Sequence, residues 1–230
     1  MIDIHSHVLP FVDDGSPDVV SSLRLVEEAQ KVGVTDLFLT PHYMKIRNYL
    51  SDYPHNREIF ESFSASVREA GLSIRLHLGN EIYYTISTVK DLKSRKVVPL
   101  GESDKVLLEF SSSEEDEDIA EAIHNMKAMG YVPIIAHPER YSYLKWSDFE
   151  IIRKMGALIQ VNASSLVGRN GTEVERTAHR LIKAGWVDFV ASDIHVFRPN
   201  NLTEAFRLVE KKAGRETAER LFSNPLLLKG

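Results

Sequence analysis

Short apolar runs rich in β-branched residues alternate with longer amphipathic segments along the whole chain. The short runs predict seven strands, at residues 2–4, 36–40, 74–78, 105–110, 132–136, 158–161 and 188–191. The segments between them carry helix signals. Ser16 and Pro17 predict an N-cap and a first helical residue before an apolar stripe. The ends of later helices are predicted at Gly71, Gly130, Gly156 and Gly185.

Strands that alternate with helical crossovers predict a parallel sheet in an α/β fold. An open doubly wound sheet and a closed barrel both satisfy this pattern, so the hydrophobic pattern leaves both open. No linker rich in Pro, Gly or Ser divides the chain, and residues 1–230 therefore predict a single domain. Residues 111–118 are rich in Ser, Glu and Asp and predict a solvated loop that leads into the acidic first turn of a helix.

Composition excludes several classes of function. The 230-residue chain contains no cysteine, which excludes structural disulfides, thiolate zinc sites, iron–sulfur clusters and cysteine nucleophiles. A net charge of −5 argues against the basic surface that nucleic acid requires. No apolar run reaches the roughly 18 to 20 residues of a membrane span, and the N-terminus does not read as a signal peptide. We expect a cytoplasmic protein with no nucleic-acid partner and no membrane insertion.

Nearly every predicted strand runs into a residue that can bind a metal. The carboxyl ends of parallel strands form one face, where loops build the site. We therefore expect eight side chains to converge in one mouth: His5, His7, His42, Glu81, Glu109, His137, Asp193 and His195. Only the sixth strand lacks such a residue and ends in Asn162.

The donor set predicts the number and type of ions. His5 and His7 lie two residues apart, so in an extended strand they project to the same side and can bind one ion. Five imidazoles and three carboxylates exceed the needs of a single ion, which predicts two or three divalent ions, and these donors suit manganese, iron or zinc. The positive charge of the divalent ions exceeds the negative charge of the three carboxylates. The resulting net positive charge favours a phosphate group as the ligand. The other four histidines lie within predicted elements and are not expected to be ligands: His55, His77, His124 and His179.

Five segments match motifs of a known family in order along almost the whole chain. They are Met1-Ile2-Asp3-Ile4-His5-Ser6-His7, Thr40-Pro41-His42, Gly79-Asn80-Glu81-Ile82, Ala136-His137-Pro138-Glu139-Arg140-Tyr141 and Ser192-Asp193-Ile194-His195. With them the chain resembles the polymerase-and-histidinol-phosphatase (PHP) superfamily, and more narrowly its bacterial capsule and exopolysaccharide protein-tyrosine phosphatases of the CpsB/YwqE type. The narrower resemblance rests on the His-Pro-Glu-Arg-Tyr segment and on Asn-Ala-Ser-Ser-Leu from Asn162, because amidohydrolases share the opening His-x-His.

This resemblance implies a distorted (β/α)7 TIM-like barrel with a trinuclear metal site, usually manganese-dependent, at the C-terminal strand ends. It implies one ion on His5, His7, Glu81 and Asp193, a second on Glu81, Glu109 and His137, and a third on His42, His195 and Asp14. Asp14 equally suits a turn before the first helix. Arg140 is implied to neutralise phosphate oxygens. Arg198 is the nearest counterpart of a second substrate-binding arginine, although its offset from Asp193 is shorter than in the family.

These residues lead to the hypothesis of phosphomonoester hydrolysis without a covalent enzyme intermediate, in which a hydroxide that bridges two ions attacks phosphorus. The resemblance implies a phosphotyrosine protein as substrate, the tail of a bacterial tyrosine kinase that governs polysaccharide export. The alternatives are a small-molecule phosphatase such as one for histidinol phosphate, an amidohydrolase, disfavoured because no strand ends in lysine, and a non-catalytic metal-binding barrel. Five aromatic residues flank the motifs and either wall the leaving group or pack internally: Phe11, Tyr43, Tyr84, Tyr141 and Phe197.

Overall fold

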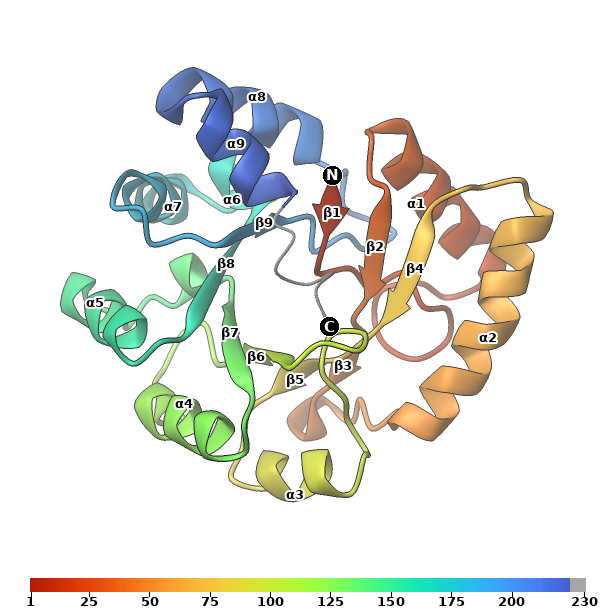
Figure 1. The fold of residues 1–230 in the computed structure, drawn as a ribbon, viewed down its shortest axis with the longest axis horizontal. Coiled ribbons are helices and arrows are strands. Elements are labelled where there is room, and N and C mark those ends of the chain that lie inside the picture. The colour runs from red at the N-terminus through yellow and green to blue at the C-terminus, as the bar shows by residue number, and fades with distance from the viewer. Residues whose placement is uncertain (224–230) are drawn as a thin grey trace.

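A computed structural model describes residues 1–223, in which short strands alternate with helices (Figure 1). Residues 224–230 of the predicted domain lie outside the described part of the chain. The strands are β1 (Ile2–Asp3), β2 (Asp36–Leu39), β3 (His42–Tyr43), β4 (Arg75–Leu78), β5 (Glu81–Tyr83), β6 (Lys105–Glu109), β7 (Val132–Ala136), β8 (Leu158–Asn162) and β9 (Phe189–Ala191). The helices are α1 (Val19–Lys31), α2 (Tyr53–Glu69), α3 (Thr88–Lys93), α4 (Ile119–Ala128), α5 (Trp146–Lys154), α6 (Ala163–Leu166), α7 (Thr172–Lys183), α8 (Leu202–Ala213) and α9 (Arg215–Phe222), with 3-10 turns η1 (Lys45–Arg47) and η2 (Pro138–Arg140).

All the strand ladders are parallel, in two hydrogen-bonded sheets with the orders β1-β2-β4 and β3-β5-β6-β7-β8-β9. β2 and β4 match the predicted strands at 36–40 and 74–78, and each is followed after a break by a short strand that was not predicted, β3 and β5. Pro41 has no N–H to donate at the first break, and at the second the side chain of Asn80 bonds to Pro41 O and Val98 N. Seven of the nine strands therefore lie at the predicted positions, and β3 and β5 are additional.

The strands surround a common centre, and the helices lie outside them (Figure 1). Beyond β1 and β9 the chain is joined by hydrogen bonds from His7 N to Ile194 O and from Asp193 N to His5 O. Side chains from both sheets fill the centre, while alternate residues such as Val106, Leu108 and Ile135 face the helices. The central cluster contains Ile2, Ile4, Phe38, Leu100, Leu107, Ile134, Ala136, Phe189 and Ala191. The predicted parallel α/β fold is confirmed, with a backbone ladder that is discontinuous where the strands are split.

Helix boundaries confirm the predicted stops and correct the predicted start. The four glycines predicted to end helices have φ between +71° and +86°, a region in which a Cβ is strained. The prediction of Ser16 as N-cap is wrong. Asp18 caps α1 by accepting a hydrogen bond from Ser21 N, because Ser16 pairs instead with Pro10 in a bridge. Residues 111–118 form the mostly exposed loop that was predicted, Asp118 is the N-cap of α4, and Glu121 lies in its first turn. None of the helices in residues 1–223 has the length and apolarity that a membrane crossing demands.

The central cluster provides a test of the fold. Leu107 is fully buried there, so Leu107→Ala removes apolar contacts and leaves a cavity. We expect the free energy of unfolding to fall by about 2–5 kcal/mol, measured by urea denaturation. Val20→Ala on the exposed face of α1 is the control, with an expected change of about 0.5 kcal/mol or less. A loss below about 1 kcal/mol for Leu107→Ala would show that the centre is not tightly packed.

Candidate metal centre

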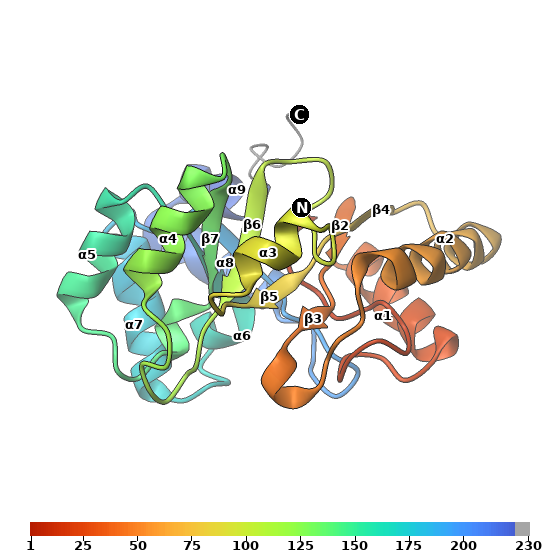
Figure 2. The ribbon, with the colours of Figure 1, turned by 90° about the horizontal axis from the view of Figure 1, so that it is seen from below.

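The carboxyl ends of the strands lie along one side of the molecule, the lower edge in Figure 2. All eight residues predicted from the strand ends meet there, and Asp14 joins them from the loop before α1. His42, Glu81 and Glu109 stand on β3, β5 and β6. His5 and His7 lie just past β1, His137 just past β7, and Asp193 and His195 just past β9. Seven of these nine residues, all except His5 and His7, line a pocket of about 280 Å³.

The innermost group contains His5, His7 and Glu81, with Asp193 beside it. Glu81 Oε2 lies 3.0 Å from His5 Nε2 and 3.1 Å from His7 Nε2. Asp193 Oδ1 lies 3.7 Å and 3.5 Å from the same two nitrogens. The four side chains therefore aim donor atoms at one small volume.

Hydrogen bonds at the back of the rings fix which nitrogens carry protons. Asp13 accepts from His7 Nδ1 at 2.8 Å, and a carboxylate has no proton to give. Gln160 Oε1 accepts from His5 Nδ1 at 3.0 Å, because the Gln160 amide donates its own N–H to Asn162. In their neutral forms both histidines thus present Nε2 lone pairs, and these nitrogens lie only 3.1 Å apart. Two lone pairs at that distance repel, so the pair requires a cation or a proton between them.

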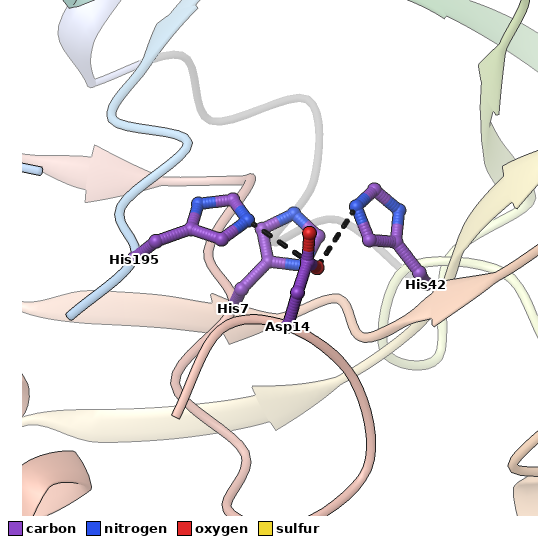
Figure 3. A group of neighbouring side chains, drawn as sticks. All are labelled: His7, Asp14, His42 and His195. Atoms are coloured by element: carbon purple, nitrogen blue, oxygen red, sulfur yellow. Dashed lines mark ion pairs between the residues drawn. The ribbon is translucent and has the colours of Figure 1, made fainter. Parts of the chain in front are cut away.

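Two further groups overlap with the first. Glu81 Oε1 lies 2.9 Å from His137 Nε2, and Glu81 Oε2 lies 2.9 Å from His42 Nδ1. Glu109 stands 3.8 Å from each of these rings. In the outer group, Figure 3 shows Asp14 between His42 and His195, at 3.5 Å and 3.7 Å, with His7 behind. His7, His42 and Glu81 each belong to two groups, so neighbouring cations would share ligands.

Several buried polar atoms here make no hydrogen bond of good geometry within residues 1–223, although Glu81 Oε2 and His42 Nδ1 are close to each other. These atoms are His42 Nδ1, Glu81 Oε2, Glu109 Oε2, His137 Nδ1 and His195 Nε2. An unsatisfied buried polar group is costly, and native proteins rarely gather several in one place. Oxygen and imidazole nitrogen are the donors that divalent first-row metals prefer. The residues present therefore fit a cluster of divalent cations.

Charge in the protein alone leads to the same conclusion. Burial lowers the pKa of His5 and His7, but nearby carboxylates outweigh it and raise the values to about 9 and about 10. Those carboxylates are Glu81 and Asp193 for His5, and Asp13 and Glu81 for His7. Burial, followed by the charge of Glu81, raises the pKa of Glu109. The site thus attracts positive charge, and metal ions would displace protons to supply it.

Two arginines stand above this floor. Arg140 Nη1 and Arg198 Nη1 lie 3.5 Å and 3.2 Å from the same atom, Asp193 Oδ2, and both line the pocket. Arg198 reaches the position beside Arg140 despite its short offset along the chain. The two guanidinium groups leave further N–H donors for an anion that enters the pocket.

Sequence reasoning missed the residues that orient the centre. Gln160 and Asn162 of β8 hold His5 and Asp193, with Asn162 Nδ2 2.7 Å from Asp193 Oδ2. Asp13 accepts a hydrogen bond from His7 Nδ1. Buried Asp3 accepts one from the backbone N–H of Ser192, the residue before Asp193 in the chain. The sequence did contain a signal for Gln160 and Asn162. They are two polar residues spaced two apart in an otherwise apolar strand, so their side chains lie on the same face.

Glu139 supports the same region from behind. Its Oε1 accepts hydrogen bonds from Asn162 N at 3.0 Å and from Ser165 Oγ at 2.7 Å. The side chain is buried, and its second oxygen has no partner in residues 1–223. Glu139 therefore ties η2, which carries Arg140, to the end of β8 and the start of α6.

Comparison with known proteins extends these observations. A family model described as "Capsular polysaccharide synthesis, CpsB/CapC" matches residues 1–227. The putative tyrosine-protein phosphatase CapC of Staphylococcus aureus is 32% identical over 99% of this chain and 91% of its own length. The tyrosine-protein phosphatase CpsB of Streptococcus agalactiae is 32% identical over 96% of this chain and 95% of its own length.

Solved structures agree with the sequence comparisons. One similar solved chain is described as "Crystal structures of YwqE from Bacillus subtilis and CpsB from Streptococcus pneumoniae, unique metal-dependent tyrosine phosphatases". It superposes with a TM-score of 0.93 at 29% identity, over 99% of this chain and 94% of that chain. An organophosphorus hydrolase from Deinococcus radiodurans shares the fold alone, with a TM-score of 0.59 at 13% identity.

Glu139 gives a test by pH. Burial raises the pKa of its carboxyl to about 7 in the folded protein, against about 4.3 in an unfolded chain. Ionisation of Glu139 therefore destabilises the folded protein. This destabilisation is absent at pH values below the pKa of Glu139 in the unfolded chain, and it is complete at pH values above its pKa in the folded protein. Glu139→Gln keeps an acceptor oxygen and removes the charge. We expect its stability relative to wild type to rise by about 2 kcal/mol between pH 5 and pH 8, measured by thermal denaturation.

The control for this experiment is Glu150→Gln, which changes an exposed carboxylate paired with Lys154. Its stability relative to wild type should vary little over the same pH range. A flat or falling difference for Glu139→Gln would mean that the Glu139 carboxyl is not held in a raised-pKa environment.

Proposed function

The chain belongs to the CpsB/CapC family of capsular polysaccharide synthesis, and from that membership we propose that it is a metal-dependent protein-tyrosine phosphatase. The observation that carries this proposal is the convergence of imidazoles and carboxylates from the strand ends beneath two arginines. Such a floor binds cations, and the arginines bind the dianionic phosphoryl group above them. The substrate class comes from the relatives, which are named as tyrosine-protein phosphatases.

The proposed ligand sets are those that the family resemblance implies, and they share most of their members with the three overlapping groups. His5, His7, Glu81 and Asp193 would hold one ion, Glu81 with Glu109 and His137 a second, and His42, His195 and Asp14 a third. The short distances from Glu81 to His5, His42 and His137 support a bridging role for this carboxylate. When bound, divalent cations stabilise negative charge on phosphoryl oxygens and lower the pKa of a coordinated water.

The residues of this chain supply position and charge. Arg140 and Arg198 would bind phosphoryl oxygens and hold the phosphorus over the floor. Asp193 Oδ2 keeps both guanidinium groups in place, and Asn162 keeps Asp193 in place. The leaving group of phosphotyrosine is a phenol with a pKa near 10, so it departs more readily than a serine alkoxide and needs less assistance from an acid.

Finer features of the proposal rest on the chemistry of the donors and on the relatives. We propose three ions, with Mn²⁺ as the metal and iron or zinc as the alternatives that the same donors accept. The proposed substrate is the phosphotyrosine tail of a bacterial tyrosine kinase, and the enzyme would act on it in the cytoplasm. Residues 1–230 would form one metallophosphatase domain, of which Arg140 and Arg198 are the substrate-binding residues.

Removal of the central carboxylate tests the metal assignment. Glu81→Ala deletes the side chain common to two of the proposed ion sites. We expect metal content, measured by mass spectrometry, to fall and turnover of a phosphotyrosine peptide to drop about 100-fold or more. The assay uses metal-depleted protein restored with manganese, zinc, iron or magnesium, and Glu102→Ala in an exposed turn is the control. Undiminished turnover in Glu81→Ala would contradict the bridging role.

Substitution of Arg140 distinguishes an effect on phosphate binding from an effect on metal binding. Arg140→Ala should keep the metal content of the wild type, because no nitrogen of Arg140 belongs to the candidate ligand groups. We expect kcat/KM for a phosphotyrosine peptide to fall about 100- to 1,000-fold and inhibition by inorganic phosphate to weaken. Arg57→Ala on the exposed surface is the matched control. Loss of metal together with activity would assign Arg140 a structural role instead.

A further inference from the structure

Three exposed apolar side chains stand on loops that contribute to the wall of the pocket. In residues 1–223 the large hydrophobic side chains that are exposed are Phe11, Val20, Ile46, Leu50, Ile86, Ile151 and Phe197. Phe11, Ile46 and Phe197 stand on three separate loops that each contribute residues to the pocket wall: Asp14 from the first, Ile46 itself from the second, and His195 and Arg198 from the third. We call Phe11, Ile46 and Phe197 the apolar rim.

The rim residues are among the most exposed of their type. Their exposed fractions are 64% for Phe11, 78% for Ile46 and 89% for Phe197. By contrast, Tyr43, Tyr84 and Tyr141 of the predicted aromatic set are buried. These three tyrosines therefore pack internally, although one edge of Tyr141 reaches the pocket wall. In the side view the η1 turn and the segment after β9 project from the same lower edge (Figure 2).

Hydrogen bonds hold the rim loops in position. Phe11 N donates to Ser16 O at 2.9 Å, and Val196 N donates to Gly15 O at 3.1 Å, which ties the first loop to the third. Met44 N donates to Tyr49 O at 2.9 Å across the second loop, and the Tyr49 ring stacks on His42 at 5.7 Å. Phe11 has a φ of +73°, a strained conformation for a residue with a Cβ. The surrounding loop holds this conformation, and the Phe11 side chain is mostly exposed.

We propose that the apolar rim binds the hydrophobic side chains that flank the phosphotyrosine of a peptide substrate. This inference rests on the proposed function and specifies its substrate. A phosphotyrosine bound over the metal floor carries its neighbouring residues across the mouth, where the rim is the apolar surface within reach. Burying an apolar side chain against a phenylalanine favours binding roughly in proportion to the area removed from water. Peptides with leucine beside the tyrosine would therefore be preferred to peptides with serine there.

A second copy of the chain is a poorer occupant of this surface. A stable dimer buries about 800 Å² on each partner. Three separate side chains on loops offer much less area than that, and their loops border the pocket. A peptide fits better, because its phosphotyrosine fills the cavity while the flanking residues contact the rim.

The test uses two matched phosphotyrosine peptides, one with leucine and one with serine on both sides of the tyrosine, beside free phosphotyrosine. For wild type we expect kcat/KM to be about tenfold higher for the leucine peptide than for the serine peptide. The double variant Ile46→Ala, Phe197→Ala should reduce that ratio to about two or less. Ile151→Ala, which shortens an exposed side chain on α5, should leave the ratio at the wild-type value. Because Ile46 and Phe197 are mostly solvent-exposed, the double variant should keep the melting temperature of wild type.

Binding provides a second measurement that does not depend on turnover. Peptides with a non-hydrolysable phosphonate in place of the tyrosine phosphate should show the same preference by fluorescence anisotropy. Equal affinities in wild type, or a leucine preference that survives in the double variant, would overturn the proposal. So would a wild-type dimer that dissociates in the double variant, because the rim would then be a subunit interface. Failure of the phosphatase assignment has a different signature, since metal-loaded wild type would then not hydrolyse free phosphotyrosine.

Discussion

The structure depends on a single buried carboxylate. Glu81 is fully buried, and its two oxygens lie within 3.1 Å of nitrogens from four histidines. A carboxylate so placed must be balanced by positive charge, because isolated charge is strongly disfavoured in the interior. The four imidazoles come from three places in the chain, with His5 and His7 after β1, His42 on β3 and His137 after β7. The parallel arrangement, with every carboxyl end on the same face, is what brings them to Glu81.

Hydrogen bonds behind the rings are as important as the donor atoms themselves. Asp13 and Gln160 hold the Nδ1–H groups of His7 and His5, so that both Nε2 atoms face inward. Asn162 connects Gln160 to Asp193, and Asp193 in turn holds both arginines. The orientation of the phosphate-binding groups is thereby coupled to the orientation of the metal-binding groups. β8, which carries no candidate ligand, provides this connection.

Much of the fold and of the candidate site was predictable, for identifiable reasons. Buried parallel strands leave apolar runs, and a histidine or acid at the end of such a run is conspicuous, so seven strand positions and eight candidate ligands could be read from the sequence. Asp14 follows no strand end and was suggested only by the family resemblance. The breaks near Pro41 and Asn80 were not predicted, because they depend on side-chain hydrogen bonds between distant segments. Ser16 was mistaken for a helix cap because its bridge to Pro10 has no local signature. The exposure of Phe11 and Phe197 depends on how three loops meet, which periodicity does not describe.

The order of the strands has a consequence for how the protein is made. His5 and His7 follow the first strand, whereas Asp193 and His195 follow the last, and hydrogen bonds join the two segments only when both are present. A chain that is still emerging from the ribosome has its first histidines exposed long before the residues that complete their surroundings have been synthesised. The centre therefore forms as a late event of biogenesis, and a truncated translation product would lack it even if most of the strands had assembled.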